Sequence, residues 1–372
     1  MKFAIEKAVL LKTLGHVQNI VERRNTVPVL SNVRIEADNN GISFKATDMD
    51  TEITEVVDAK ILENGALTAP AHMMYDIVRK LSDGSEIELI FPDEKEQLSI
   101  VSGRSKFSLP TIGIEDFPAI STDSLPTNFS IKRDELKDII DRTQFAVSTE
   151  ETRYYLNGLY IHPKDEGETK VLRIVATDGH RLACVESPLP EGAENMQGVI
   201  LPRKTVGEIR KLLDDTSAES VQISLSDSKV RFTLDDIALA SKLIDGTYPD
   251  YERVIPTTNN KILELSVKTL SSAVDRVSVV AEKTRAIKMI ANKNHVIVTT
   301  SSPDLGSAIE EIEAYYDNES LEIGYNFRYL LDILAEIKGD TVRFSFSDSS
   351  SPSLIHDTSD TSAIYVLMPM RV

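Results

Sequence analysis

At 372 residues the chain is longer than one small hydrophobic core requires, so two or three domains are expected. Its composition, 41% hydrophobic and 27% charged, is typical of a soluble globular protein, and it has no run of about 18 apolar residues that could span a membrane. Charges interrupt residues 1–14, which argues against a secretory signal, and the single cysteine, Cys184, excludes an internal disulfide. We therefore expect a cytoplasmic protein with a buried structural thiol. The formal net charge of −18 argues against a nucleic-acid partner unless positive side chains gather on one surface.

The first part of the chain alternates strand-like and helix-like patterns. Apolar side chains three and four residues apart predict helices over 7–24 and 72–81. Segments with a period of two predict strands at 2–5, 27–35, 41–48, 65–70, 87–91, 98–102 and 105–109. A unit consisting of a strand, a helix and several strands is therefore expected twice before a turn-rich boundary over 116–126.

Two more copies of this doubled unit follow. Helices are predicted over 132–143, 203–214, 268–285 and 327–338. Strands are predicted at 128–131, 153–161, 199–202, 221–223, 230–232, 262–265, 287–290, 296–298, 321–325, 342–346 and 364–370. The turn Ala46-Thr47-Asp48 recurs as Ala176-Thr177-Asp178, and Phe117-Pro118 recurs as Tyr248-Pro249. We predict an α+β protein of three similar domains, each a doubled strand-helix-strands unit, over 1–123, 124–255 and 256–372.

Positive charge is concentrated on the predicted helices. These six segments hold 20 Lys and Arg against 12 Asp and Glu, whereas the rest of the chain holds 21 against 47. The simplest explanation is that Lys and Arg are good helix formers, but Glu is an equally good one and is depleted there. If the six helices share one face, that face could follow nucleic-acid phosphates without reading the bases.

The sequence lacks the common catalytic motifs. It has no phosphate-binding Gly-x-x-x-x-Gly-Lys loop, no Gly-x-Ser-x-Gly elbow and no His-Glu-x-x-His pair, and its six histidines have no cysteine partners at zinc spacing. Asp178 and His180 are the one pair that would suit a hydrolase. Two residues apart in a tight turn, they are better explained as a turn former and a surface contact. We expect no enzyme activity, no metal and no cofactor.

Four segments carry a family resemblance, namely 153–158, 176–183, 248–254 and 365–371. Together with the threefold repeat, they make the whole chain closely resemble the bacterial DNA sliding clamps, the β subunit of DNA polymerase III. The resemblance implies a non-catalytic processivity factor, in which two chains join head to tail into a ring with helices inside and sheets outside. The implied partners are double-stranded DNA, a second copy of the chain, the DNA polymerase III alpha subunit, the clamp loader, and other polymerases and repair proteins with clamp-binding peptides.

The resemblance also implies a peptide-binding pocket between the second and third domains. Its deeper apolar half corresponds to Leu156, Thr177, Gly179, His180, Leu182, Pro249, Val254, Val366 and Met368. Its shallower half corresponds to Asn326, Tyr329, Pro369, Met370 and Arg371, with Arg153 and Arg253 at the rim. Met and Leu walls adapt to different peptides, while His180 and Arg371 supply hydrogen-bond donors. The alternative for 368–370 is a plain terminal strand.

Two further surfaces are implied by the resemblance. DNA contacts correspond to Arg24, Tyr154, Tyr155, Arg203 and Lys204. The dimer interface corresponds to Ile77, Leu81, Arg104, Lys106 and Phe107 at one end and to Val279, Val280, Glu310, Glu311 and Glu313 at the other. The sequence departs from the family pattern at Glu150 and Glu151, where two acids precede the predicted DNA contacts, and at His72, Ser350 and Pro352.

Two alternative functions fit parts of the sequence. A peptide-binding scaffold that never encircles DNA would share the pocket but not the basic helices. A hydrolase built on Asp178 and His180 would lose its activity when His180 is replaced, whereas a clamp would lose only peptide binding.

Overall fold

A computed structural model describes the whole chain except residues 93–96, 122–123, 168 and 282–284. The chain divides into two compact units. Unit 1 contains Met1–Leu136, Pro190–Ala193 and Lys204–Leu243, and unit 2 contains Lys137–Leu189, Glu194–Arg203 and Ile244–Val372. The predicted boundary at residue 123 falls on a residue outside the described ones.

The six predicted helices are present in the predicted order, whereas eight of the described strands were not predicted. The helices are α1 (Lys7–Ile20), α2 (Ala71–Lys80), α3 (Arg133–Gln144), α4 (Arg203–Asp215), α5 (Val267–Ala281) and α6 (Phe327–Ala335), and the 3-10 helices are η1 (Pro28–Ser31), η2 (Glu151–Leu156) and η3 (Tyr251–Val254). The strands up to β13 are β1 (Lys2–Glu6), β2 (Asn32–Asp38), β3 (Gly41–Thr47), β4 (Thr51–Val57), β5 (Lys60–Glu63), β6 (Gly65–Pro70), β7 (Glu86–Ile90), β8 (Gln97–Ser102), β9 (Ser105–Pro110), β10 (Thr127–Lys132), β11 (Gly158–Glu166), β12 (Thr169–Thr177) and β13 (Arg181–Pro188). The remaining strands are β14 (Val199–Pro202), β15 (Ser220–Leu225), β16 (Lys229–Leu234), β17 (Ile237–Lys242), β18 (Lys261–Ser266), β19 (Ala286–Asn292), β20 (His295–Ser302), β21 (Gly306–Glu313), β22 (Tyr315–Tyr316), β23 (Leu321–Asn326), β24 (Thr341–Phe346), β25 (Ser353–Asp357) and β26 (Ala363–Leu367). The strands that were not predicted are β4, β5, β12, β13, β17, β21, β22 and β25.

Sheet pairing follows one rule that is repeated in all three predicted domains. The strand before each helix does not join the meander that follows its own helix but the meander of the other half: β1 joins β7-β8-β9, and β6 joins β2-β3-β4. In the same way β10 joins β15-β16-β17 and β14 joins β11-β12-β13, while β18 joins β24-β25-β26 and β23 joins β19-β20-β21. The six half-sheets therefore have one topology, which confirms the α+β fold of three doubled domains.

Half-sheets of neighbouring domains merge through their last strands. In unit 1, β4 pairs antiparallel with β17, which makes an eight-stranded sheet. In unit 2, β13 pairs antiparallel with β26, which makes a nine-stranded sheet. The two half-sheets left over end in β9 and β21, which have no strand on their outer side among the described residues. Each is an open edge that offers backbone hydrogen-bonding groups.

The Ala-Thr-Asp turns of the first and second domains have the same hydrogen bonds. Thr47 Oγ1 donates to Thr51 O and Thr177 Oγ1 donates to Arg181 O, at 2.9 and 2.7 Å. Asp48 Oδ1 accepts from the N–H groups of Asp50 and Thr51, and Asp178 Oδ1 accepts from those of His180 and Arg181. A side chain that repeats the backbone's own turn bonds in this way makes both turns rigid.

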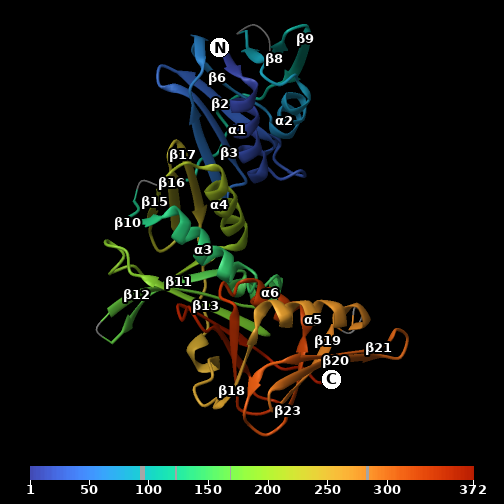
Figure 1. Cartoon of the computed structure of the whole chain (residues 1–372). Helices are drawn as coiled ribbons and strands as arrows, with labels where there is room; N and C mark the ends of the chain where they lie inside the picture. The colour runs from blue at the N-terminus through green and yellow to red at the C-terminus, as the bar shows by residue number, and fades with distance from the viewer. Residues whose placement is uncertain (93–96, 122–123, 168, 282–284) are drawn as a thin grey trace. The chain divides into compact units, whose positions relative to one another are not determined.

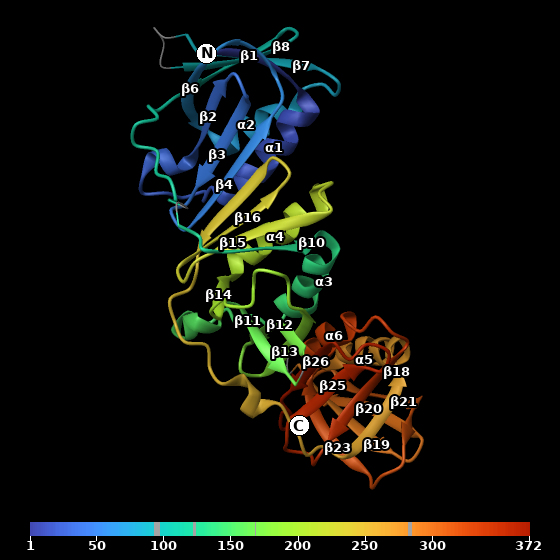
Figure 2. The same cartoon turned by 90° about the vertical axis from the view of Figure 1, so that its left-hand side faces the viewer.

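Helices pack against the sheets within each unit. In unit 1, α1 contacts β3, β4 and α2, and in unit 2, α5 contacts α6, β20 and β21 (Figures 1 and 2). The apolar faces read from the sequence are buried: Leu10, Leu14 and Val17 of α1 have no exposed surface. Cys184 is buried as predicted, at 2% exposure. No helix of the described residues is long and apolar enough to cross a bilayer.

Several predicted ends of helices and strands differ from the structure. The helices α1 and α6 end at Ile20 and Ala335, short of the predicted 24 and 338; the described part of α5 ends at Ala281, and residues 282–284 of the predicted helix 268–285 lie outside the described residues. The six helices consequently hold 14 Lys and Arg against 10 Asp and Glu, a smaller positive excess than predicted, because Arg23, Arg24 and Lys338 lie beyond the helix ends. The terminal strand ends at Leu367 rather than Met370.

A buried histidine links three elements of unit 1. His16 of α1 is 6% exposed, with Nδ1 2.8 Å from Glu55 Oε2 on β4 and Nε2 3.3 Å from Asp215 Oδ2 at the end of α4. Thr13 donates to the other oxygen of Glu55, and Lys12 donates to Asp215 O. Burial alone would lower the pKa of His16, but the hydrogen bonds and charges of Glu55 and Asp215 outweigh it and raise that pKa.

This linkage predicts a pH-dependent stability. Because the folded pKa of His16 lies above its unfolded value of about 6.5, the stabilisation is complete below that value and is lost as the pH rises through the folded pKa. We expect the free energy of unfolding in urea to be constant below about pH 6.5 and to fall as the pH rises above it, and His16→Gln to remove that fall. The same fall in both proteins would assign it to another group.

Candidate functional site

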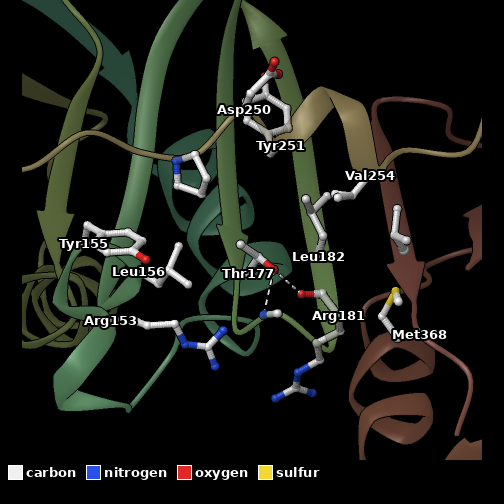
Figure 3. A pocket seen from close by; sticks show the side chains of 13 residues that line it. Arg153, Tyr155, Leu156, Thr177, Arg181, Leu182, Asp250, Tyr251, Val254 and Met368 are labelled. Atoms are coloured by element: carbon white, nitrogen blue, oxygen red, sulfur yellow. Dashed lines mark hydrogen bonds between the residues drawn. The ribbon is translucent and has the colours of Figure 1, made fainter.

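An open cavity of about 330 Å³ lies in unit 2 beside the turn that follows β12. Thirteen residues line it: Arg153, Tyr155, Leu156, Thr177, Gly179, Arg181, Leu182, Pro249, Asp250, Tyr251, Val254, Val366 and Met368 (Figure 3). They come from η2, the turn between β12 and β13, the segment around η3, and β26 with the residue after it. Four segments far apart in the sequence thus build one concave, mostly apolar site, the kind that takes a small ligand or a peptide side chain.

The floor of the cavity is the surface of a hydrophobic core. Leu156, Leu182 and Val366 are between 2 and 4% exposed and pack with Val175, Cys184, Ile200, Tyr248 and Tyr251 in one cluster. Burial raises the pKa of Tyr248 and of Tyr251, so both hydroxyls stay protonated at neutral pH. Rigid walls of this kind give a ligand a preformed apolar surface.

Gly179 lies at the mouth of the cavity in a conformation that suits glycine. Its φ is +86°, and a Cβ placed there would lie 2.7 Å from Arg153 Nη1. Arg153 Nη2 donates to Asp178 O at 3.2 Å, and its Nε donates to Glu150 at 2.8 Å. Glu150, one of the acids that depart from the family pattern, therefore holds the rim arginine in place.

The sequence analysis did not assign four lining residues to the pocket, namely Tyr155, Arg181, Asp250 and Tyr251, and of these Arg181 has the most contacts. Its side chain is 9% exposed and contacts Asp178, Asp332 of α6 and the carbonyl of Phe145 at the end of α3. Its guanidinium also lies 4.3 Å from the ring centre of Tyr329 and 5.0 Å from that of Phe145. The cation joins the turn of the cavity to two helices, and its contact with a carbonyl at the helix end agrees with the dipole of α3.

The structure brings together most of the predicted deeper half and leaves the shallower half outside. Eight of its nine residues line the cavity; His180 does not, and its ring instead stacks on Tyr329 at 6.1 Å between centroids. Arg253 is also outside, exposed and paired with Asp250. Asn326 caps α6, and Met370 and Arg371 line a separate cavity with Lys288 and Ser301.

The chain after β26 is docked on the sheet although it is not a strand. Met368 N–H donates to His180 O, and Met370 N–H donates to Gly324 O, both at 2.9 Å. The carbonyl of Met370 also occupies the space in which a Cβ on Gly324 would lie, at 2.3 Å. Pro369 lies between the two docked residues, and Met368 is therefore held at the cavity while Met370 is not part of it.

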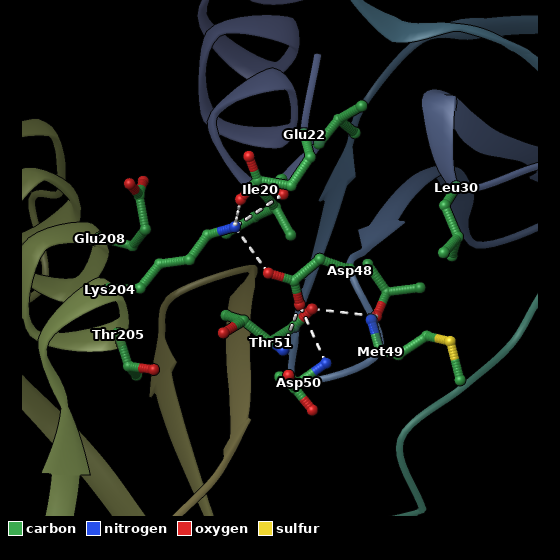
Figure 4. A network of polar contacts seen from close by, with 12 residues as sticks. Ile20, Glu22, Leu30, Asp48, Met49, Asp50, Thr51, Lys204, Thr205 and Glu208 are labelled. Carbon is green, nitrogen blue, oxygen red and sulfur yellow. Dashed lines mark hydrogen bonds and ion pairs between the residues drawn. The ribbon is translucent and has the colours of Figure 1, made fainter. Parts of the chain in front are cut away.

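The residues predicted to contact DNA have different environments. Arg24, Tyr154 and Arg203 are exposed, whereas Tyr155 is half-buried and lines the cavity. Lys204 is held inside unit 1: its Nζ lies 2.5 Å from Glu22, 2.6 Å from Asp48 and 3.2 Å from Ile20 O (Figure 4). Burial opposes its charge, but hydrogen bonds to Asp48 and Glu22 raise the pKa of Lys204. Two carboxylates thus pair with this cation within the single chain, and its contact with DNA stays a prediction.

The predicted dimer residues lie along the two open edges. Arg104, Lys106 and Phe107 are exposed on or just before β9, while Ile77 and Leu81 are half-buried at the end of α2. On the other side Val279 of α5 is 72% exposed, Val280 is half-buried, and Glu311 and Glu313 of β21 are exposed. Glu310 is an exception, because Arg276 of the same chain already binds both of its carboxylate oxygens. Ile309, which the sequence analysis did not single out, directly precedes these acids on β21 and is 70% exposed.

The catalytic alternative has no geometric support. The Oδ1 atom of Asp178 accepts backbone N–H groups of the turn and Oδ2 binds Arg181, so the carboxylate is engaged by groups other than the His180 ring. A general base needs its carboxylate partner on its ring nitrogen. Among the described residues, no group of three or more His, Cys, Asp or Glu could hold a metal.

Known proteins match this chain over its whole length. Models of the N-terminal, central and C-terminal domains of the DNA polymerase III beta subunit match residues 1–121, 130–250 and 252–371. The beta sliding clamp of Caulobacter vibrioides is 50% identical over 373 residues, all of both chains. A crystal structure of the Caulobacter crescentus beta sliding clamp (49% identity, TM-score 0.97) covers all of this chain and 99% of that one. A sliding clamp from Bartonella birtlesii bound to griselimycin (46% identity, TM-score 0.96) covers both chains fully.

Proposed function

The chain belongs to the DNA polymerase III beta subunit family, and from that premise we propose that two copies join head to tail into a ring around duplex DNA and hold partner peptides in the cavity of unit 2. Like the sliding clamps that it resembles, the protein is a processivity factor of DNA replication. It is not an enzyme. The family matches support domain boundaries near residues 123 and 255.

The observation that carries the ring is the rule by which half-sheets merge. β4 is the last strand in the first half of the first domain, and it pairs antiparallel with β17, the last strand in the second half of the second domain. β13 of the second domain and β26 of the third pair in the same way. Among the last strands of first halves, β21 has no such partner, and among the last strands of second halves, β9 has none in the described chain. Pairing β21 of one copy with β9 of another satisfies the same rule and gives each of these two strands a partner. Because the two surfaces differ, the contact is heterologous, and two copies of three domains each would close it.

Sequence-independent binding fits the distribution of charge. The helices carry a small positive excess in a chain of net charge −18, so phosphate contacts through residues such as Arg24 and Arg203 would be few and salt-sensitive. A ring needs no tight grip, because it stays on DNA by enclosing it. Such a protein would work in the cytoplasm with the clamp loader, which opens the ring.

Partner binding fits the cavity beside η3. Griselimycin is the bound ligand of the Bartonella birtlesii relative, and we propose that this chain takes griselimycin and clamp-binding peptides in the cavity lined by Leu182, Val366 and Met368. These peptides would belong to the DNA polymerase III alpha subunit and to other polymerases and repair proteins. Apolar peptide side chains would fill the floor, and Arg153 at the rim would fix their direction.

The experiment that tests encirclement compares circular with linear DNA. Labelled protein is placed on a nicked circle by the clamp loader and ATP, and free protein is removed by gel filtration. We expect it to stay on the circle and to be lost within minutes once a restriction enzyme cuts the circle, because a ring slides off a free end. Equal loss from both DNA forms would contradict the ring and favour the peptide-binding scaffold.

A further inference from the structure

One wall of the cavity is a loop segment whose backbone makes few hydrogen bonds to the rest of the unit. Pro249, Asp250, Tyr251 and Val254 form this wall, on or beside η3, which has four residues. Ile244 N–H donates to Ile200 O before the segment and Asn260 N–H donates to Phe346 O after it. For 245–259 in the described chain, the structure records no backbone hydrogen bond to another segment. Side chains must therefore fix the wall.

Three side chains on one face of β11 supply these attachments. Tyr160, His162 and Lys164 are two residues apart and so point to the same side of the sheet. Tyr160 stacks on Tyr248 with centroids 4.7 Å apart and planes at 7°. His162 Nε2 lies 2.8 Å from the hydroxyl of Tyr251, and Lys164 pairs with Glu252.

Arg173 connects these attachments with the interior of the sheet. It lies opposite His162 on β11 and opposite Glu186 on β13, so the three form one row across the strands. The Nη1 atom donates to the hydroxyl of Tyr251 at 3.3 Å and to Glu252 at 2.9 Å, while Nε donates to Glu186 at 2.9 Å. A guanidinium has a fixed fork of donors, so Arg173 ties the wall to β13, the strand that carries Leu182 of the cavity floor.

We propose that Arg173, acting through Tyr251 and Glu252, is a positioning residue that holds η3 in place as a wall of the peptide cavity. This inference rests on the proposed function. Arg173 does not line the cavity and touches no ligand. It sets the fraction of molecules in which the wall is closed, and the apparent affinity of a ligand falls as that fraction falls.

The test separates wall closure from ligand binding. Arg253 is 83% exposed in its side chain and follows Tyr251 and Glu252, so trypsin cleavage after it reports local opening of η3. Tyr251→Phe keeps the ring of the cavity and removes only the hydroxyl; we expect cleavage to become about fivefold faster. Arg173→Lys also loses the bond to Glu252, so we expect cleavage at least about tenfold faster and a griselimycin Kd raised roughly fivefold by calorimetry.

Matched controls come from elsewhere in unit 2. Tyr325→Phe removes a buried hydroxyl bonded to Ser353, and Arg343→Lys weakens an arginine pair with Glu264; neither residue lines the cavity. Both should leave the cleavage rate at Arg253 and the Kd unchanged. The double variant Tyr251→Phe/Arg173→Lys should cleave faster than Arg173→Lys by less than the fivefold effect of Tyr251→Phe alone, because both changes remove the contact between Arg173 and the Tyr251 hydroxyl and only the His162 contact is lost in addition. Unchanged cleavage and affinity in both test variants would overturn the role of Arg173, whereas a wild-type protein that does not bind griselimycin would contradict the cavity's proposed function.

Discussion

A chain carrying both Val279→Lys and Ile309→Lys is expected to fold normally but to remain monomeric. The two apolar side chains, on α5 and on the open strand β21, are 72% and 70% exposed, so replacing them costs the single chain little. In the proposed ring they are buried against a second copy. Burying two such side chains contributes about 3 kcal/mol or more, so the dimer Kd should rise on the order of 100-fold. The new lysines would also face Arg104 and Lys106 of the second copy.

Sedimentation equilibrium measures this dissociation directly. Met49→Lys is a suitable control, because Met49 is another exposed apolar residue, at 51%, and lies in the turn after β3 rather than at an open edge. The control should keep the dimer Kd of the unmodified chain. The double variant should also leave circular DNA as fast as linear DNA. A dimer of unchanged Kd would contradict β21 as the interface strand.

Periodicity was enough to predict the repeat because each half buries one helix face and one sheet face. The helices of all six halves begin within a residue or so of the predicted starts. Helix ends were harder: the chain leaves α1 at Ile20, although the apolar pattern continues to Val21 and two arginines follow. No glycine or proline marks that end, and only tertiary packing decides it.

Two segments predicted as strands begin with a 3-10 helix. Val27–Ile35 and 153–161 both contain apolar and β-favouring residues, yet η1 covers Pro28–Ser31 and η2 covers Glu151–Leu156. A 3-10 turn folds an apolar residue inward without needing a partner strand, and Leu30 and Leu156 are buried in this way at 7% and 4%. Both errors fall in the segment that follows the first helix of a domain, so they reflect the repeat.

The candidate site could be predicted where it depends on local sequence and not where it depends on distant packing. Thr177, Gly179 and Leu182 lie in the segment 176–183, one of those that carry the family resemblance, and the resemblance assigns them to the pocket. The role of Arg181 depends on Asp332 and Phe145, and the role of Arg173 on Tyr251, which are far away in the chain. The ion pairs of Lys204 could not be predicted for the same reason, because Glu22 and Asp48 reach it only in the folded unit.

Replacing Arg181 with alanine is expected to lower both stability and ligand binding. Arg181 is 9% exposed in its side chain, and its loss would leave the carboxylate of Asp178, 15% exposed, without its cation. Breaking a buried charge network costs about 3–5 kcal/mol, so the Tm of unit 2 should fall on the order of 10 °C. The turn over 177–181 would lose its tie to α3 and α6, and the mouth of the cavity at Gly179 would loosen.

Calorimetry separates the two effects of this change. Arg343→Ala is the control, because Arg343 is 41% exposed and pairs with Glu264 on a neighbouring strand; it should cost about 1 kcal/mol or less and leave griselimycin binding intact. Arg181→Lys should recover part of the Tm but not the affinity, because an ammonium group cannot reach Asp178, Asp332 and the Phe145 carbonyl together. Equal Tm losses for the alanine variants of Arg181 and Arg343 would show that the network around Asp178 is no stronger than a surface pair. Asp48 lies in the matching turn of unit 1 and binds Lys204, which also donates to Ile20 O at the end of α1. The same comparison made with Lys204→Ala would then measure whether both turns depend on a cation that contacts a helix end.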